Sequence, residues 1–233
     1  MEVAVLTVPR GFPYVTQTVA SMLLGGAPER IWMVCGSVDE SHLAPLRHHE
    51  KIRVVGMSAE HHTVISDWSV QRKIAFNFVR ALTLLPFGED VLVAEDDIVL
   101  CDGWLASAAA MFAAAREKHG KFLLLLFSPD TTRDDGDGFG SYDGRMFGGQ
   151  LVLVPAELRA SLASFVTREC VVGDASAHDA CLRAYCVARR TVLLAASRSL
   201  AQHVGSVSTH GNLRHIAPRS STFGHLASED ADF

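Results

Sequence analysis

Residues Val91–Leu105 read VLVAEDDIVLCDGWL, and this stretch decides the fold that the sequence predicts. Its beginning, together with the preceding residue, is the short apolar run DVLVA at 90–94, which is typical of a buried strand. Glu-Asp-Asp follows directly at 95–97, and an alanine-rich helix is predicted from Trp104 to about Lys118. Because open α/β sheets bind their ligands beyond the carboxyl ends of the strands, these acids are expected to lie in a functional site.

Upstream of this stretch, short apolar runs alternate with predicted helices. The predicted strands are Glu2–Val8, Ile31–Cys35 and Ile52–Val55, and the predicted helices are Tyr14–Leu24, Leu43–His49 and Ser69–Leu85. Such alternation is typical of a parallel sheet whose faces are covered by helices. The upstream half therefore predicts an α/β fold.

Downstream, the pattern continues with one long loop. Lys121–Phe127 (KFLLLLF) predicts a central strand, Gln150–Val154 and Thr191–Ala195 predict two more, and Ala175–Tyr185 predicts a helix. Residues 128–149 are too rich in Gly and Asp for a regular element. Loops of this length often cover a site, so we expect a mobile lid here.

The length and composition fit one globular domain over residues 1–233. Of the 233 residues, 48% are apolar and 20% are charged, which excludes a disordered or fibrous chain. The formal net charge of -5 provides no general attraction to nucleic acid or to anionic lipid. An anionic substrate must therefore be bound by local groups, such as a metal ion.

Cysteine usage and hydropathy predict a cytoplasmic protein. The five cysteines are an odd number without a CxxC pair, which favours reduced thiols over a disulfide framework or a structural zinc site. The first residues suit a strand better than a signal peptide, and no run reaches the roughly 20 apolar residues of a membrane span. We therefore expect no transmembrane segment.

Three consecutive acids are costly to crowd together unless a cation or hydrogen-bond donors balance them. Carboxylates suit Mn²⁺ or Mg²⁺, which also accept phosphate oxygens. We expect Asp97 to bind the ion directly, Asp96 through water or a basic partner, and Glu95 to face a ribose. The alternative is a solvated strand end whose acids cap a turn. A metal-dependent phosphatase is a weaker alternative, because the acids do not read Asp-x-Asp.

Two further segments are candidates for the same site. The run Gln202–Gly205 contains His203, a possible nitrogen ligand or diphosphate donor. Gly148 and Gly149 precede a predicted strand and allow close approach of the backbone to a ligand. Each signal alone is weak, since such residues also serve turns.

Three strings in this order, VLVAEDDIVLCDGWL, MFGGQLVLVP and SLAQHVGSVSTHG, resemble the core of the N-acetylglucosaminyltransferase IV family and its small viral and bacterial relatives. The resemblance covers roughly Asp90–Gly211. It implies a Rossmann-like GT-A glycosyltransferase with a mostly parallel sheet. Residues 1–100 would form the nucleotide-sugar half, residues 101–215 the acceptor half, and residues 216–233 a polar tail.

The resemblance also implies partners and residue roles. The donor would be a nucleotide-diphosphate sugar, most simply a UDP-sugar, and the acceptor a glycan or glycoprotein. Asp97 would hold Mn²⁺ between the two phosphates, and His203 would complete the metal or diphosphate shell. Further donor contacts would come from Thr7, Val8, Pro9, Arg10 and Lys73.

A general base must remove the proton of the acceptor hydroxyl in an inverting transfer. Asp174 and Asp179 stand on either side of a predicted helix start, and both are candidates. We favour Asp179, because Asp174 has a structural alternative as the helix N-cap. A catalytically silent carbohydrate-binding protein of the same fold is the competing function.

Overall fold

The computed structural model describes residues 1–233 except 87, 129–134, 143–148, 174–177, 206–219 and 224–233. The strands are β1 (Glu2–Thr7), β2 (Ile31–Cys35), β3 (Ile52–Val55), β4 (Val91–Glu95), β5 (Ile98–Leu100), β6 (Phe122–Leu125), β7 (Phe139–Ser141), β8 (Leu151–Val154), β9 (Val192–Ala196) and β10 (Ala201–His203). The helices are α1 (Tyr14–Gly25), η1 (Ser41–Leu46), α2 (Ala59–Ile65), α3 (Val70–Leu84), α4 (Trp104–Lys118), α5 (Ala156–Val166), η2 (Thr167–Val172) and α6 (His178–Arg189).

One eight-stranded sheet passes through both halves of the chain, in the order β3-β2-β1-β4-β8-β6-β9-β7. Strands β1 to β4 pair in parallel, as do β6 and β9. Strand β8 runs antiparallel between β4 and β6, and β7 is an antiparallel edge strand. The mostly parallel sheet confirms the predicted α/β fold.

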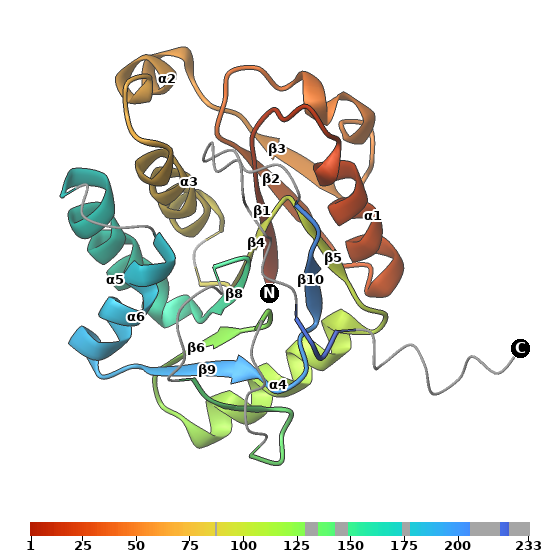
Figure 1. Cartoon of the computed structure of the whole chain (residues 1–233), viewed down its shortest axis with the longest axis vertical. Coiled ribbons are helices and arrows are strands. Elements are labelled where there is room, and N and C mark those ends of the chain that lie inside the picture. The colour runs from red at the N-terminus through yellow and green to blue at the C-terminus, as the bar shows by residue number, and fades with distance from the viewer. Residues whose placement is uncertain (87, 129–134, 143–148, 174–177, 206–219, 224–233) are drawn as a thin grey trace, which may run out of the picture.

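Helices cover both faces of the sheet, as Figure 1 shows. Val3 and Val5 of β1 pack in one core with α1 and α4, whereas Ala4 and Leu6 pack in a second core with α3, α5 and α6. Successive residues of a strand point to opposite faces, so a strand covered on both faces must be apolar throughout. The unbroken run VLVA of β4 meets this need.

Local signals set the ends of α3, the helix that leads into β4. The Ser69 hydroxyl caps its first turn by accepting a hydrogen bond from the backbone N–H of Arg72. The helix ends at Leu84, just before Leu85 and Pro86, because a residue that precedes proline disfavours the helical conformation. None of the helices that the structure describes is long and apolar enough to cross a membrane.

The expectation of five reduced thiols is wrong for two of them. Cys170 of η2 and Cys181 of α6 form a disulfide, while Cys35, Cys101 and Cys186 are free. The separation of eleven positions between the paired cysteines gives no local spacing signal. The pair forms because η2 and α6 pack side by side on α5 and α3, a tertiary arrangement that a cysteine count does not indicate.

Loss of this disulfide should lower the stability of the protein. Because the bond closes a short loop, we expect Cys181→Ser to reduce the free energy of unfolding by about 3 kcal/mol. Thermal melts with and without reductant measure the effect, with Cys101→Ser as a control that keeps the disulfide. Reductant should lower the melting temperature of the wild type and of the control but not that of Cys181→Ser. Five free thiols in the denatured, unreduced protein would contradict the assignment.

Candidate functional site

A two-stranded ribbon brings the C-terminal segment back to the acidic run. The chain leaves β4 at Glu95, turns, and continues as β5, which pairs antiparallel with β10. His203 lies opposite Ile98 in this ribbon, and the backbone N–H of Val204 donates to the carbonyl of Asp97 at 2.8 Å. The pairing therefore places His203 beside Asp97, although 106 positions separate them in the chain.

Thr18 of helix α1 holds the turn that carries Asp96 and Asp97. The hydroxyl of Thr18 lies 2.8 Å from the carbonyl oxygen of Asp96 and 2.7 Å from that of Ile98, and it accepts from the backbone N–H of Ile98 at 3.2 Å. Thr18 is fully buried, so these bonds satisfy backbone groups that have no water nearby. The turn that presents the acids is thus held rigidly.

Arg10 bridges two of the three acids. Its guanidinium lies 2.7 Å from Oδ1 of Asp96 and 2.7 Å from Oδ2 of Asp97. Burial alone would lower the pKa of Arg10, but the charges of Asp96 and Asp97 outweigh it and raise the pKa above its usual value. The sequence predicts water or a basic partner for Asp96, and Arg10 is a basic partner.

The electrostatics of the acids show a shortage of positive charge. Burial, followed by the charge of Asp97, raises the pKa of Glu95 to about 8. Burial also raises the pKa of Asp96 to about 6, against the effect of Arg10. Burial opposes ionisation of Asp97 too, but hydrogen bonds and charges from His203 and Arg10 hold its pKa below the usual value. Among the described residues, Arg10 is the one guanidinium beside these three acidic side chains, and the raised pKa values of Glu95 and Asp96 show that their ionisation is disfavoured.

The donor groups around Asp97 fit a divalent cation. One ligand atom from each of Glu95, Asp97 and His203 lies within 4.8 Å of the others. Oδ2 of Asp97 and Nε2 of His203 are 3.2 Å apart, close to the roughly 3 Å between neighbouring ligands of an octahedral ion with bonds of about 2.1 Å. Oδ1 of Asp97 is buried and has no hydrogen-bond partner among the described residues. Carboxylate and imidazole ligands suit Mn²⁺.

Gly205 leaves the room that this arrangement needs. A Cβ atom at this position would lie 2.4 Å from Oδ2 of Asp97 and 3.1 Å from Nε2 of His203. Real Cβ atoms do not approach other atoms so closely, so any larger residue would displace the Asp97 carboxylate. The glycine that follows His203 in the sequence therefore has a specific steric role.

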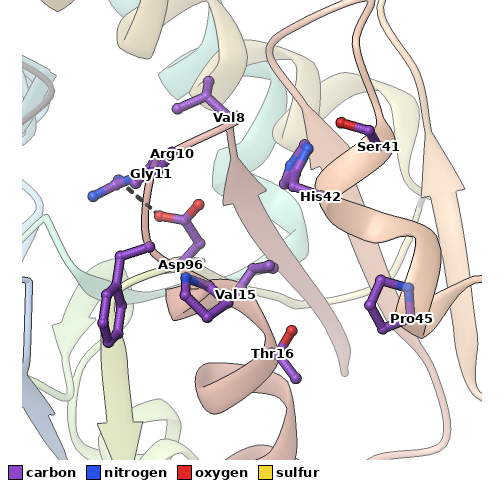
Figure 2. A pocket seen from close by; sticks show the side chains of 11 residues that line it. Val8, Arg10, Gly11, Val15, Thr16, Ser41, His42, Pro45 and Asp96 are labelled. Atoms are coloured by element: carbon purple, nitrogen blue, oxygen red, sulfur yellow. Dashed lines mark ion pairs between the residues drawn. The ribbon is translucent and has the colours of Figure 1, made fainter.

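A cleft of about 340 Å³ opens next to the acids, at the carboxyl end of β1 (Figure 2). Arg10 and Asp96 lie on one side of it, and His42 of η1 lies on the other. Most of its wall is apolar or backbone. The remaining lining residues are Val8, Gly11, Phe12, Pro13, Val15, Thr16, Ser41 and Pro45.

The residues predicted around the first strand lie at or near this cleft. Val8 and Arg10 line it, and Thr7 donates a hydrogen bond to Asp96 at 2.7 Å. Pro9 is their neighbour in the chain but is not among the lining residues. Lys73 differs: its ammonium group donates to the backbone carbonyl of Ser66 at 2.6 Å, and no described contact joins it to the acids.

Two further predicted residues, Gly149 and Asp179, lie near Glu95 at the start of α6. The start of α6 packs against Gly149, because a Cβ there would lie 2.7 Å from Nε2 of His178 and 3.3 Å from Cβ of Asp179. Nε2 of His178 is 4.0 Å from Oε1 of Glu95, and the charge of Asp179 contributes to the raised pKa of Glu95. Asp174 and Gly148 are outside the described residues.

Sequence reasoning missed three residues of this region: Thr18, His42 and His178. Thr18 is one of many polar residues on an amphipathic helix, and nothing marks it as a partner of the acidic turn. His42 carried a detectable signal, because it follows a strand at the same sheet edge as the acids. His178 stands next to the predicted Asp179, but a histidine beside an acid is not itself a signal.

No protein-family model matches the sequence, and a search of curated proteins finds no match. Solved structures do resemble the fold. The galactosyltransferase LgtC, in complex with donor and acceptor sugar analogues, superposes with a TM-score of 0.51 at 13% identity over 78% of this chain and 69% of LgtC. Mouse xyloside xylosyltransferase 1 gives a TM-score of 0.49 at 11% identity over 83% of this chain and 84% of its own. At such low identity the LgtC likeness establishes architecture alone, and the chain therefore has the GT-A fold.

Proposed function

We propose that this protein is a metal-dependent glycosyltransferase that moves a hexosyl group from a nucleotide-diphosphate sugar, most simply a UDP-sugar, to a hydroxyl of a glycan or glycoprotein. One observation carries the proposal. An acidic cluster in which Asp96 and Asp97 are buried and the pKa of Glu95 is raised lies at the carboxyl end of β4, beside a cleft at the end of β1. A diphosphate with a divalent cation fits this combination of charges.

Asp97, Glu95 and His203 are the proposed ligands of Mn²⁺ or Mg²⁺. The bound ion would stabilise the negative charge that develops on the diphosphate leaving group. Arg10 holds Asp96 and Asp97 in place and offers a guanidinium to phosphate oxygens. A ribose contact is the alternative role of Glu95, whose side chain is partly exposed.

The donor would lie with its nucleoside in the cleft at the end of β1. The apolar wall suits a flat heterocycle, and Arg10 and Asp96 line the cleft on the side of the acids. Thr7 and Val8 act on this site by holding Asp96, since both hydrogen-bond to its carboxylate. Lys73 stays a candidate for a phosphate contact only if its side chain leaves the Ser66 carbonyl.

Asp179 is the proposed general base, with Asp174 as the alternative. It lies in the first turn of α6, on the acceptor side of Glu95, and its carboxylate accepts from the backbone N–H of Ala180 at 2.8 Å. A base at this place would take the proton of the acceptor hydroxyl while the hydroxyl oxygen bonds to the anomeric carbon from the face opposite the departing diphosphate, which inverts the anomeric configuration.

A donor panel tests the proposed function without knowledge of the acceptor. Transferases slowly hydrolyse their own donors, so we expect Mn²⁺-dependent release of nucleoside diphosphate from one UDP-sugar. UDP-N-acetylglucosamine, UDP-glucose, UDP-galactose, UDP-rhamnose and GDP-mannose form the panel. If no donor is hydrolysed but one binds with Mn²⁺, the protein is a silent binding protein. If none binds, the proposal is wrong.

Binding of Mn²⁺ should strengthen as pH rises from about 6.5 to 8.5. The pKa of Glu95 is about 8, so the metal-free folded protein carries a proton on this carboxyl at pH 7, and the cation must displace it. One released proton corresponds to roughly tenfold in affinity per pH unit below the pKa. The affinity should level off above pH 8.

The raised pKa of Glu95 also predicts how the stability of the metal-free protein changes with pH. The pKa of Glu95 in the folded protein lies above the ordinary value of 4.5. The stability that Glu95 contributes to the metal-free protein is therefore fully present below pH 4.5 and is lost as pH rises through 8. The stabilisation by Mn²⁺ should therefore grow over this range. Melts and Mn²⁺ titrations of the wild type and of Glu95→Gln measure both effects. An equally steep pH dependence in Glu95→Gln would contradict the assignment.

A further inference from the structure

A chain of three side chains connects the acidic cluster to the far wall of the cleft. Nε2 of His42 lies 3.1 Å from the hydroxyl oxygen of Thr7, and this hydroxyl lies 2.7 Å from Oδ2 of Asp96. Thr7 and Asp96 are buried, whereas His42 is half-buried in the cleft wall (Figure 2). The chain therefore ends on a ring that faces a ligand space.

The direction of each hydrogen bond in this chain is fixed. The groups recorded beside the Asp96 carboxylate are donors or cations, because Oδ1 pairs with the Arg10 guanidinium at 2.7 Å and the backbone N–H of Val8 donates to the carboxylate. Its carboxylate is therefore the acceptor, and Thr7 donates its single proton to it. The Thr7 oxygen can then only accept from His42. Nε2 of His42 must carry the hydrogen.

This direction sets the tautomer of His42. A neutral imidazole that carries hydrogen on Nε2 has a lone pair on Nδ1. Burial lowers the pKa of His42, against the charges of Asp39 and Glu40, which favours this neutral form. Nδ1 is itself buried and has no hydrogen-bond partner among the described residues. His42 therefore offers one hydrogen-bond acceptor that the described residues leave unused.

We propose that Nδ1 of His42 accepts a hydrogen bond from the ring N–H of the donor's nucleobase and so determines which base the cleft takes. Uracil and guanine carry such an N–H, whereas cytosine and adenine have a lone pair at the corresponding ring nitrogen. The inference rests on the proposed function, because it assumes a nucleoside in the cleft. A base fits the place better than a ribose, since the lining includes the apolar residues Val8, Phe12, Pro13, Val15 and Pro45.

Methylated nucleotides test this inference on the unaltered protein. Calorimetry with Mn²⁺ compares UDP with N3-methyl-UDP, CDP and 2′-deoxy-UDP, and GDP with N1-methyl-GDP. Leaving a buried acceptor unpaired should weaken binding of the methylated form of the preferred base roughly 10- to 100-fold. CDP should be weakened similarly, while 2′-deoxy-UDP should keep most of the affinity.

A substitution adds an independent readout. His42→Leu should weaken binding of the preferred nucleotide by a similar factor and abolish its advantage over the methylated form. His48→Leu is the matched control, because His48 is exposed two residues beyond η1 and outside the cleft. Equal binding of methylated and unmethylated nucleotides by the wild type would overturn the inference but leave the proposed function standing. The inference would also be overturned if 2′-deoxy-UDP, and not the methylated nucleotides, lost affinity. If no nucleoside diphosphate binds with Mn²⁺, the proposed function itself fails.

Discussion

Replacement of Asp97 by Asn is expected to reduce Mn²⁺-dependent binding of UDP by on the order of 100-fold or more, because the proposed ion loses its central ligand. Asn has the same shape as Asp but lacks the charge, so the substitution separates charge from packing. Asp96 keeps its bond to Arg10 in this variant, and the turn keeps its bonds to Thr18. We therefore expect the fold to persist and the melting temperature without metal to change little.

Calorimetric titration of UDP with and without Mn²⁺ measures this effect. Asp102→Asn is the matched control, since Asp102 is an exposed acid only five residues further along the chain. The control should bind UDP as the wild type does, at equal Mn²⁺. Mn²⁺-dependent UDP binding that survives unchanged in Asp97→Asn would show that the cation, if any, binds elsewhere.

Replacement of Asp179 by Ala is expected to remove sugar transfer while donor binding stays intact. Loss of a general base typically costs 10²- to 10⁴-fold in rate. Its side chain is not part of the ion pairs that join Asp97 to Arg10 and to His203. The described link from Asp179 to the proposed metal site is the small contribution of its charge to the raised pKa of Glu95, so we expect donor binding at pH 8 and above to change little.

UDP release in the presence of p-nitrophenyl glycosides as acceptors measures the rate, and calorimetry measures donor binding in the same variants. Asp174→Ala is tested beside Asp179→Ala. If transfer stops in Asp174→Ala and continues in Asp179→Ala, the base is Asp174. A product with retained anomeric configuration would contradict a single general base altogether.

Much of the fold could be predicted because its signals are local. The central residues of β4 and of its neighbours β1 and β8 are apolar, as burial on both faces requires. The three-residue strands β5, β7 and β10 were missed because they are too short to show a period of two. Each forms only where a distant segment pairs with it. The antiparallel direction of β8 likewise depends on tertiary packing.

In the candidate site, too, local features could be predicted and contacts between distant segments could not. A run of acids after a buried strand is visible in the sequence, and so is a histidine in a segment that resembles a known family. Their contact is not visible, because it depends on the pairing of β5 with β10. The support from Thr18 and the chain from Asp96 to His42 also cross from one element to another. Physical reasoning from sequence therefore identified charged groups better than the neutral side chains that orient them.

The most direct test of the account is a crystal structure of the protein with Mn²⁺ and UDP, in which anomalous scattering locates the ion. We predict that the ion is bound by the carboxylate of Asp97, with the diphosphate on its open side and the uracil in the cleft beside His42. An ion bound away from Asp97, with that carboxylate still paired only to Arg10 and His203, would contradict the central claim.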